Sequence, residues 1–122
     1  MAKEKFSISK RLQSFKYAFN GLKILVSEEH NSRVHIIAAI VVIILGFILS
    51  ISAYEWIALV FAIGFVITME IVNSAIENIC DFISPEKHQL IKKIKDLAAA
   101  AVLLSAITAV IVGLIIFIPK VY

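Results

Sequence analysis

The chain has 122 residues, of which 61% are hydrophobic and only 17% charged, and its formal net charge at pH 7 is +3. An average soluble domain is about half apolar, with about a quarter of its residues charged. The composition therefore excludes an ordinary soluble domain and favours an integral membrane protein, with residues 1–122 forming a single domain. The one cysteine, Cys80, excludes a disulfide within the chain.

The N-terminal segment, about residues 8–30, is predicted to form a basic amphipathic helix. Its apolar residues recur at intervals of three and four, as they do on one face of a helix. They are Ile8, Leu12, Phe15, Phe19, Leu22 and Val26. Because Lys10, Arg11, Lys16 and Lys23 lie largely off this face, the pattern is typical of a helix in the membrane–water interface. The alternative is that the apolar face packs on the protein's own core, and both can hold.

Three apolar runs, at about residues 34–52, 56–82 and 97–118, are predicted to cross the membrane. The first and the third contain no Asp, Glu, Lys or Arg, and each has about the 20 residues that a hydrocarbon core requires. A short turn is expected at residues 53–55, with Tyr54 and Trp56 as interfacial aromatics. A second break is expected near Ser84, which would cap the next helix with Pro85 in its first position. Pro119 is expected to end the last helix.

The basic residues predict the orientation of the chain. Eleven of the twelve Lys and Arg residues precede the first run or lie between the second and third, and Lys120 is the exception. Since cytoplasmic loops carry the excess of Lys and Arg, the N-terminus is expected in the cytoplasm and the C-terminus outside.

A row of polar side chains continues the second apolar run: Glu70, Asn73, Glu77 and Asp81. Their spacing of three, four and four places them on one helix stripe about 80° wide, which rises about 16 Å from the first to the last. Counted from Trp56, Glu70 falls inside the inner leaflet.

A solvated helix face would explain the shallow end of this row, but it does not explain Glu70. A charged carboxylate inside a bilayer costs a few kcal/mol and is usually functional. Asn73 alone would suit a contact between helices. Beside Glu70 and Glu77 it is more typical of a site.

The acidic row suggests a hard cation, because Mg²⁺ usually takes one or two carboxylates together with substrate phosphates. Glu29 precedes the first run at the depth of Glu77, although it could simply pair with Arg33 four residues on. Lys95 and Asp96 lie at the cytoplasmic end of the third run. There Lys95 is equally suited to hold phosphate or to flank the membrane.

His35, just inside the first run, is either a buried, hydrogen-bonded residue with a structural role, which we favour, or a site residue. The chain has no glycine-rich signature of a soluble nucleotide-binding protein.

The motif E-x-x-N-S-A-I-E-x-x-x-D, which begins at Glu70 and is followed by Lys95-Asp96, closely resembles the prokaryotic integral membrane diacylglycerol kinase family, which includes undecaprenol kinases. The similarity extends to F-x-x-A-x-x-G from Phe15 and to E-x-N-x-R-x-H from Glu29, and so covers nearly the whole chain. The second of these motifs is more similar to that of the undecaprenol kinases.

The resemblance implies an all-α membrane protein with an interfacial helix and three transmembrane helices. It also implies a homotrimeric bundle in the bacterial cytoplasmic (inner) membrane, with active sites shared between subunits. The implied reaction transfers the γ-phosphate of MgATP to the primary hydroxyl of a lipid alcohol. The acceptor is undecaprenol or diacylglycerol, and the product undecaprenyl phosphate or phosphatidic acid.

The resemblance also implies roles for individual residues. Glu70 is the general base, Glu29 and Glu77 bind Mg²⁺ together with the ATP phosphates, and Asn73 positions the substrate with Glu70 and Arg33. The implied nucleotide contacts are Glu29, Glu77, Asp81, Lys95, Asp96 and either Lys10 or Arg11.

Two readings from other classes compete with a kinase. A small proton-coupled transporter would use Glu70, but would call for a fourth span and would not require the other polar residues of the row together with Lys95 and Asp96. A structural membrane subunit would have no chemistry at all.

Overall fold

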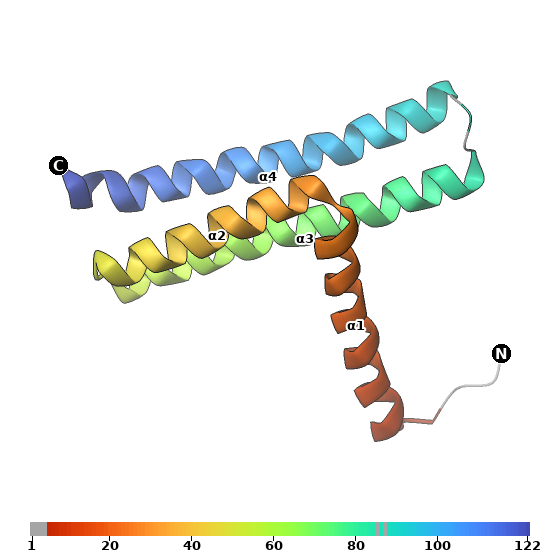
Figure 1. The fold of residues 1–122 in the computed structure, drawn as a ribbon, viewed down its shortest axis with the longest axis horizontal. Helices are drawn as coiled ribbons and strands as arrows, with labels where there is room; N and C mark the ends of the chain where they lie inside the picture. The colour runs from red at the N-terminus through yellow and green to blue at the C-terminus, as the bar shows by residue number, and fades with distance from the viewer. Residues whose placement is uncertain (1–4, 85, 87) are drawn as a thin grey trace.

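The computed structural model describes residues 5–84, 86 and 88–122, which form four α helices (Figure 1). The helices are α1 (Ile8–Glu28), α2 (His30–Ile48), α3 (Ala53–Ile83) and α4 (Gln89–Val121). Helices α2, α3 and α4 lie alongside one another, and α1 projects steeply from their side (Figure 1). By length and composition, α2, α3 and α4 can each cross a membrane. The predicted all-helical fold is confirmed, and the three predicted spans correspond to three helices that are candidates for crossing a membrane.

Helix α3 is the centre of the bundle, because α4 packs along it and α2 and α1 also contact it. A small buried cluster of Ile51, Leu59 and Ile116 joins α3 and α4 to the turn that follows α2. Many other large apolar side chains remain exposed, such as Phe61 at 77% and Ile115 at 68%. Apolar surface on this scale is stable only when lipid or another protein chain covers it.

The turn between α2 and α3 occupies residues 49–52 rather than the predicted 53–55, because Ala53 is already helical. Ser52 caps α3: its Oγ accepts the backbone N–H of Glu55 at 3.2 Å, and the Glu55 carboxylate accepts the N–H of Ser52 at 2.9 Å. This reciprocal pair satisfies two donors of the first turn. Lys120 lies 3.0 Å from the same carboxylate and so ties the end of α4 to the start of α3.

The break near Ser84 is present, but the predicted cap is wrong. Ser84 has extended backbone angles and ends α3, and α4 begins only at Gln89. The N-cap of α4 is His88, whose Nδ1 accepts a backbone N–H of the first turn. Pro85 lies outside the described residues.

Helix α4 continues through Pro119 to Val121, so the prediction that Pro119 ends the helix is also wrong. Proline removes one backbone donor and crowds the carbonyl four residues earlier. Because Pro119 lies in the last turn, only Lys120 and Val121 follow it in the helix, and the lost hydrogen bond affects little of α4.

Helix α1 is joined to α2 by a single extended residue, Glu29. Arg33 closes the end of α1, because its Nε donates to the Val26 carbonyl and its Nη2 to the Ser27 carbonyl, both at 2.6 Å. The predicted apolar face of α1 is largely uncovered, with Phe15 64% and Phe19 68% exposed. Within the described residues, packing of α1 on the chain's own core is limited to the buried Leu25 and to the contacts of α1 with α2 and α3.

Gly46 provides a test of the α2–α3 contact. A Cβ at this position would lie 2.7 Å from Cη2 of Trp56 and 3.2 Å from Cδ1 of Ile51. Overpacking of this kind typically costs about 1–3 kcal/mol. We therefore expect Gly46→Ala to lower the thermal unfolding midpoint in detergent by roughly 5 °C or more.

Gly64→Ala is the matched control, because its Cβ would meet nothing within 4 Å. Equal unfolding midpoints for the two variants would contradict the close packing of Gly46 against Trp56.

Candidate active site

Glu70 lies in the middle of α3 and is only 4% exposed. The first turns of α2 supply its neighbours. Ser32 Oγ donates to Oε2 at 3.2 Å, and His35 Nε2 lies 3.1 Å from Oε1. Within the described part of the chain, Oε1 forms no well-aligned hydrogen bond. Oε1 therefore keeps an unused acceptor position, as expected of a buried carboxylate oxygen that can take up a proton.

Asn73 and Glu77 are the next members of the row. Asn73 Nδ2 donates to Glu77 Oε1 at 3.3 Å. This contact orients the amide, and its buried Oδ1 has no hydrogen-bond partner among the described residues. Asn73 therefore offers a second open acceptor one turn from Glu70.

Glu29 reaches the same stretch of α3 from the junction between α1 and α2. Ser74 Oγ donates to Glu29 Oε1 at 3.0 Å. The carboxylates of Glu29 and Glu77 therefore contact adjacent residues of α3, Ser74 and Asn73. No group of three or more His, Cys, Asp or Glu side chains that could hold a metal occurs among the described residues. Two carboxylates nevertheless suit Mg²⁺ when nucleotide phosphates supply further ligands.

The Asp81 end of the row is held by ion pairs. Lys95 Nζ lies 2.6 Å from Asp81 Oδ1 and joins α4 to α3, and Lys92 pairs with Asp96 at 2.6 Å along α4. Both pairs are well exposed, so each contributes little to folding by itself.

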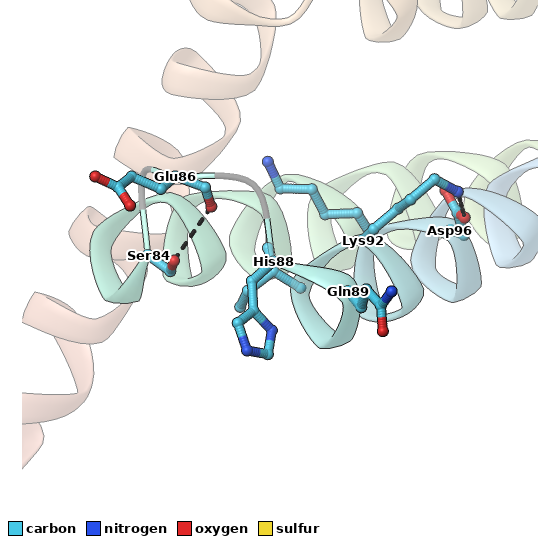
Figure 2. A pocket seen from close by; sticks show the side chains of 8 residues that line it. Ser84, Glu86, His88, Gln89, Lys92 and Asp96 are labelled. Atoms are coloured by element: carbon cyan, nitrogen blue, oxygen red, sulfur yellow. Dashed lines mark hydrogen bonds and ion pairs between the residues drawn. The ribbon is translucent and has the colours of Figure 1, made fainter.

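A polar pocket of about 490 Å³ opens beside these ion pairs (Figure 2). Its lining comes from the end of α3, the connection and the first turns of α4: Ser84, Glu86, His88, Gln89, Ile91, Lys92, Lys95 and Asp96. Figure 2 shows Lys92 and Asp96 in contact at one end and Glu86 close to Ser84 at the other. The pocket is lined by cationic, anionic and amide side chains, including Lys95, Asp96 and Gln89.

A second hollow, of about 370 Å³, is an apolar groove between α2 and α4 with α3 as its floor. His35 lies at its polar end, and Phe117 belongs to the opposite end of α4. Apart from His35, every residue that lines it is apolar, including Ala38, Ala62 and Ala106. The groove therefore resembles a site for a hydrocarbon chain, and the polar end of such a ligand would lie beside His35.

The structure does not bring every predicted site residue together. Arg33 is engaged with the last carbonyls of α1. Lys10 and Arg11 lie in the first turn of α1, roughly 27 Å from Glu29 along the helix. Within one chain, these two basic residues are therefore remote from the carboxylates.

The sequence pattern does not predict that Ser32 and Ser74 belong to the site. Of the two roles considered for His35, its contact with Glu70 favours the site position, and its side chain is 27% exposed rather than buried. The available signal was the spacing of Ser32 and His35, three residues apart at the start of an apolar helix.

Comparison with known proteins identifies the family. The sequence model described as prokaryotic diacylglycerol kinase matches residues 16–117. An undecaprenol kinase of Bacillus subtilis is 37% identical over 113 residues, covering 93% of this chain and 92% of the relative. A diacylglycerol kinase of Synechocystis is 36% identical over 109 residues, covering 88% of this chain and 62% of the relative. A diacylglycerol kinase of Escherichia coli K12 is 31% identical over 111 residues, covering 91% of each chain.

These matches confirm the resemblance carried by the motif that begins at Glu70. They give no support to a proton-coupled transporter. The chain belongs to the prokaryotic diacylglycerol kinase family and is a membrane lipid kinase that uses a nucleotide co-substrate.

Proposed function

We propose that this kinase transfers the γ-phosphate of MgATP to the primary hydroxyl of a membrane alcohol, either undecaprenol or diacylglycerol. The observation that carries the proposal is the buried Oε1 of Glu70, which makes no well-aligned hydrogen bond among the described residues. Its neighbour His35, 3.1 Å away, lines the polar end of the apolar groove. A lipid alcohol matches this arrangement, with its chain in the groove and its hydroxyl at the carboxylate.

Glu70 is the proposed general base. Phosphoryl transfer depends mainly on positioning and on neutralising charge, and the attacking hydroxyl must lose its proton. Glu70 Oε1 would take that proton while Ser32 fixes Oε2. The open Oδ1 of Asn73 would accept a hydrogen bond and so help to orient the reacting groups.

Glu29 and Glu77 are the proposed Mg²⁺ ligands, together with the phosphates of ATP. The chemistry that bound Mg²⁺ supplies is neutralisation of charge on the phosphoryl oxygens. Ser74 and Asn73 would hold the two carboxylates in place through the contacts they already make.

The pocket beside Lys95 and Asp96 is the proposed nucleotide site. Lys95 presents a point charge to phosphate, and Asp81 holds its ammonium group at 2.6 Å. Lys10 or Arg11 would join this site only from a neighbouring subunit, because α1 carries both away from the carboxylates of its own chain. This distance supports the homotrimer with shared active sites that the family resemblance implies.

The proposed setting is the bacterial inner membrane, with the N-terminus in the cytoplasm and the C-terminus outside. Helix α1 would lie in the cytoplasmic interface with its apolar face in lipid. Its steep angle to α2, α3 and α4 and the exposure of Phe15 and Phe19 support this placement.

The proposal is tested by incubating the purified protein with γ-labelled ATP and Mg²⁺ in lipid micelles. Undecaprenol and diacylglycerol are offered separately, so the two rates identify the preferred acceptor. We expect label in at least one lipid product and loss of labelling when EDTA removes Mg²⁺. No labelled lipid from either alcohol, or full labelling in EDTA, would contradict the proposal.

Replacing the proposed base tests the assignment of Glu70. We expect Glu70→Gln to lower kcat by about 100-fold or more, because the amide keeps the shape but cannot take the proton. Glu28→Gln, at an exposed acid at the end of α1, should leave kcat unchanged. Full activity in Glu70→Gln protein of normal oligomeric size would refute the assignment.

Lys95→Met tests the nucleotide site. We expect KM for ATP to rise about tenfold or more, since a charge-assisted contact to phosphate contributes about 1.5–3 kcal/mol. Lys93→Met, an exposed lysine on the same helix, is the control and should leave KM for ATP near the wild-type value. Equal KM values for the two variants would remove Lys95 from the site.

A further inference from the structure

A buried base raises the question of where its proton goes. Each turnover delivers one proton to the proposed base, Glu70, and the next turnover needs an ionised carboxylate again. Glu70 is 4% exposed, so it has little direct access to water. A neighbouring group that can accept a proton and is itself more exposed would solve this problem.

His35 has the required position. Its Nε2 lies 3.1 Å from Glu70 Oε1, the oxygen that is free of well-aligned hydrogen bonds, and Ser32 holds the other oxygen at 3.2 Å. The side chain of His35 is 27% exposed, against 6% for that of Glu70. Histidine is also the side chain best suited to exchange protons near neutral pH.

Among the described residues around His35, Glu70 is the one placed to exchange a proton with the imidazole. Among the described residues, Glu70 on α3 is the charged group within ion-pair distance of the imidazole. On its own helix, the guanidinium of Arg33 is directed to the carbonyls of Val26 and Ser27. The groove residues that α4 contributes beside His35 are apolar.

We propose that His35 is a proton relay that resets Glu70 after each phosphoryl transfer; this inference rests on the proposed role of Glu70. The lipid O–H bond breaks and its proton moves to Glu70 Oε1. The lipid oxygen then bonds to the γ-phosphorus while the bond from that phosphorus to ADP breaks. Glu70 next passes the proton to His35 Nε2, and the imidazolium releases a proton to water. The carboxylate and the neutral imidazole are both restored.

A purely structural role for His35 makes a different prediction. If the imidazole only held Glu70 in place, its loss would slow the first turnover and all later turnovers equally. A relay affects only the turnovers that follow the first, because the first needs no reset. Rapid-quench kinetics therefore separate the two roles.

The test compares wild-type protein and His35→Gln with labelled ATP and the lipid alcohol that the wild type phosphorylates. Glutamine can still contact Glu70 but cannot carry the proton. We expect a first turnover at close to the wild-type rate and a steady-state rate about tenfold or more lower, since a proton-transfer group contributes at least that much. The result is a burst of one product per site, and added imidazole should accelerate the slow phase.

His30→Gln is the matched control, because His30 is exposed at the start of the same helix and should show wild-type kinetics. His35→Asn is a second variant that should give the same burst if His35→Gln does not fold. An unchanged steady state, or first and later turnovers slowed equally without imidazole rescue, would overturn the relay. In both cases the wild-type protein would still phosphorylate the lipid, so the proposed function would stand. Failure of the proposed function would instead appear as the absence of lipid product from the wild-type protein.

Discussion

The burial of one carboxylate in an apolar helix bundle is the constraint on which the rest of this site depends. Glu70 has almost no access to solvent, and a charge inside a membrane protein is tolerated only beside protein or water partners. Those partners come from α2, where Ser32 and His35 reach the two carboxylate oxygens. Contact between α2 and α3 therefore joins the two helices and also places a polar group of α2 beside each oxygen of Glu70.

Depth along α3 organises the remaining groups. The apolar groove reaches His35 beside Glu70, the carboxylates of Glu29 and Glu77 meet α3 one to two turns later, and the polar pocket lies at the end of the helix. The two substrates of a lipid kinase are separated along the same direction, because the lipid hydroxyl lies in the membrane and the nucleotide phosphates lie in water. Helix α3 therefore brings the proposed base, the proposed metal ligands and the proposed nucleotide contact together in the order that a lipid and a nucleotide would require.

Much of this arrangement followed from the sequence, because helical periodicity and apolar length are local properties. They predicted three spans and the row from Glu70 to Asp81. The turn before α3 was displaced because Ser52 and Glu55 cap each other, and this pair ends the turn earlier than the apolar pattern suggested. Ser32 and His35 could not be assigned from the pattern, since their contact with Glu70 spans helices far apart in the chain. The distance of Lys10 and Arg11 from the carboxylates likewise depends on the direction of α1, which a single extended residue, Glu29, determines.

The central claim is that the α2 contacts act on catalysis through Glu70. A double-mutant cycle on the rate of the first turnover tests it most directly, because residues that act as a unit are not additive. The cycle combines Ser32→Ala with Glu70→Gln. We expect Ser32→Ala to slow the wild-type enzyme and to have no further effect once Glu70 is glutamine. Equal effects of Ser32→Ala in the two backgrounds would contradict it.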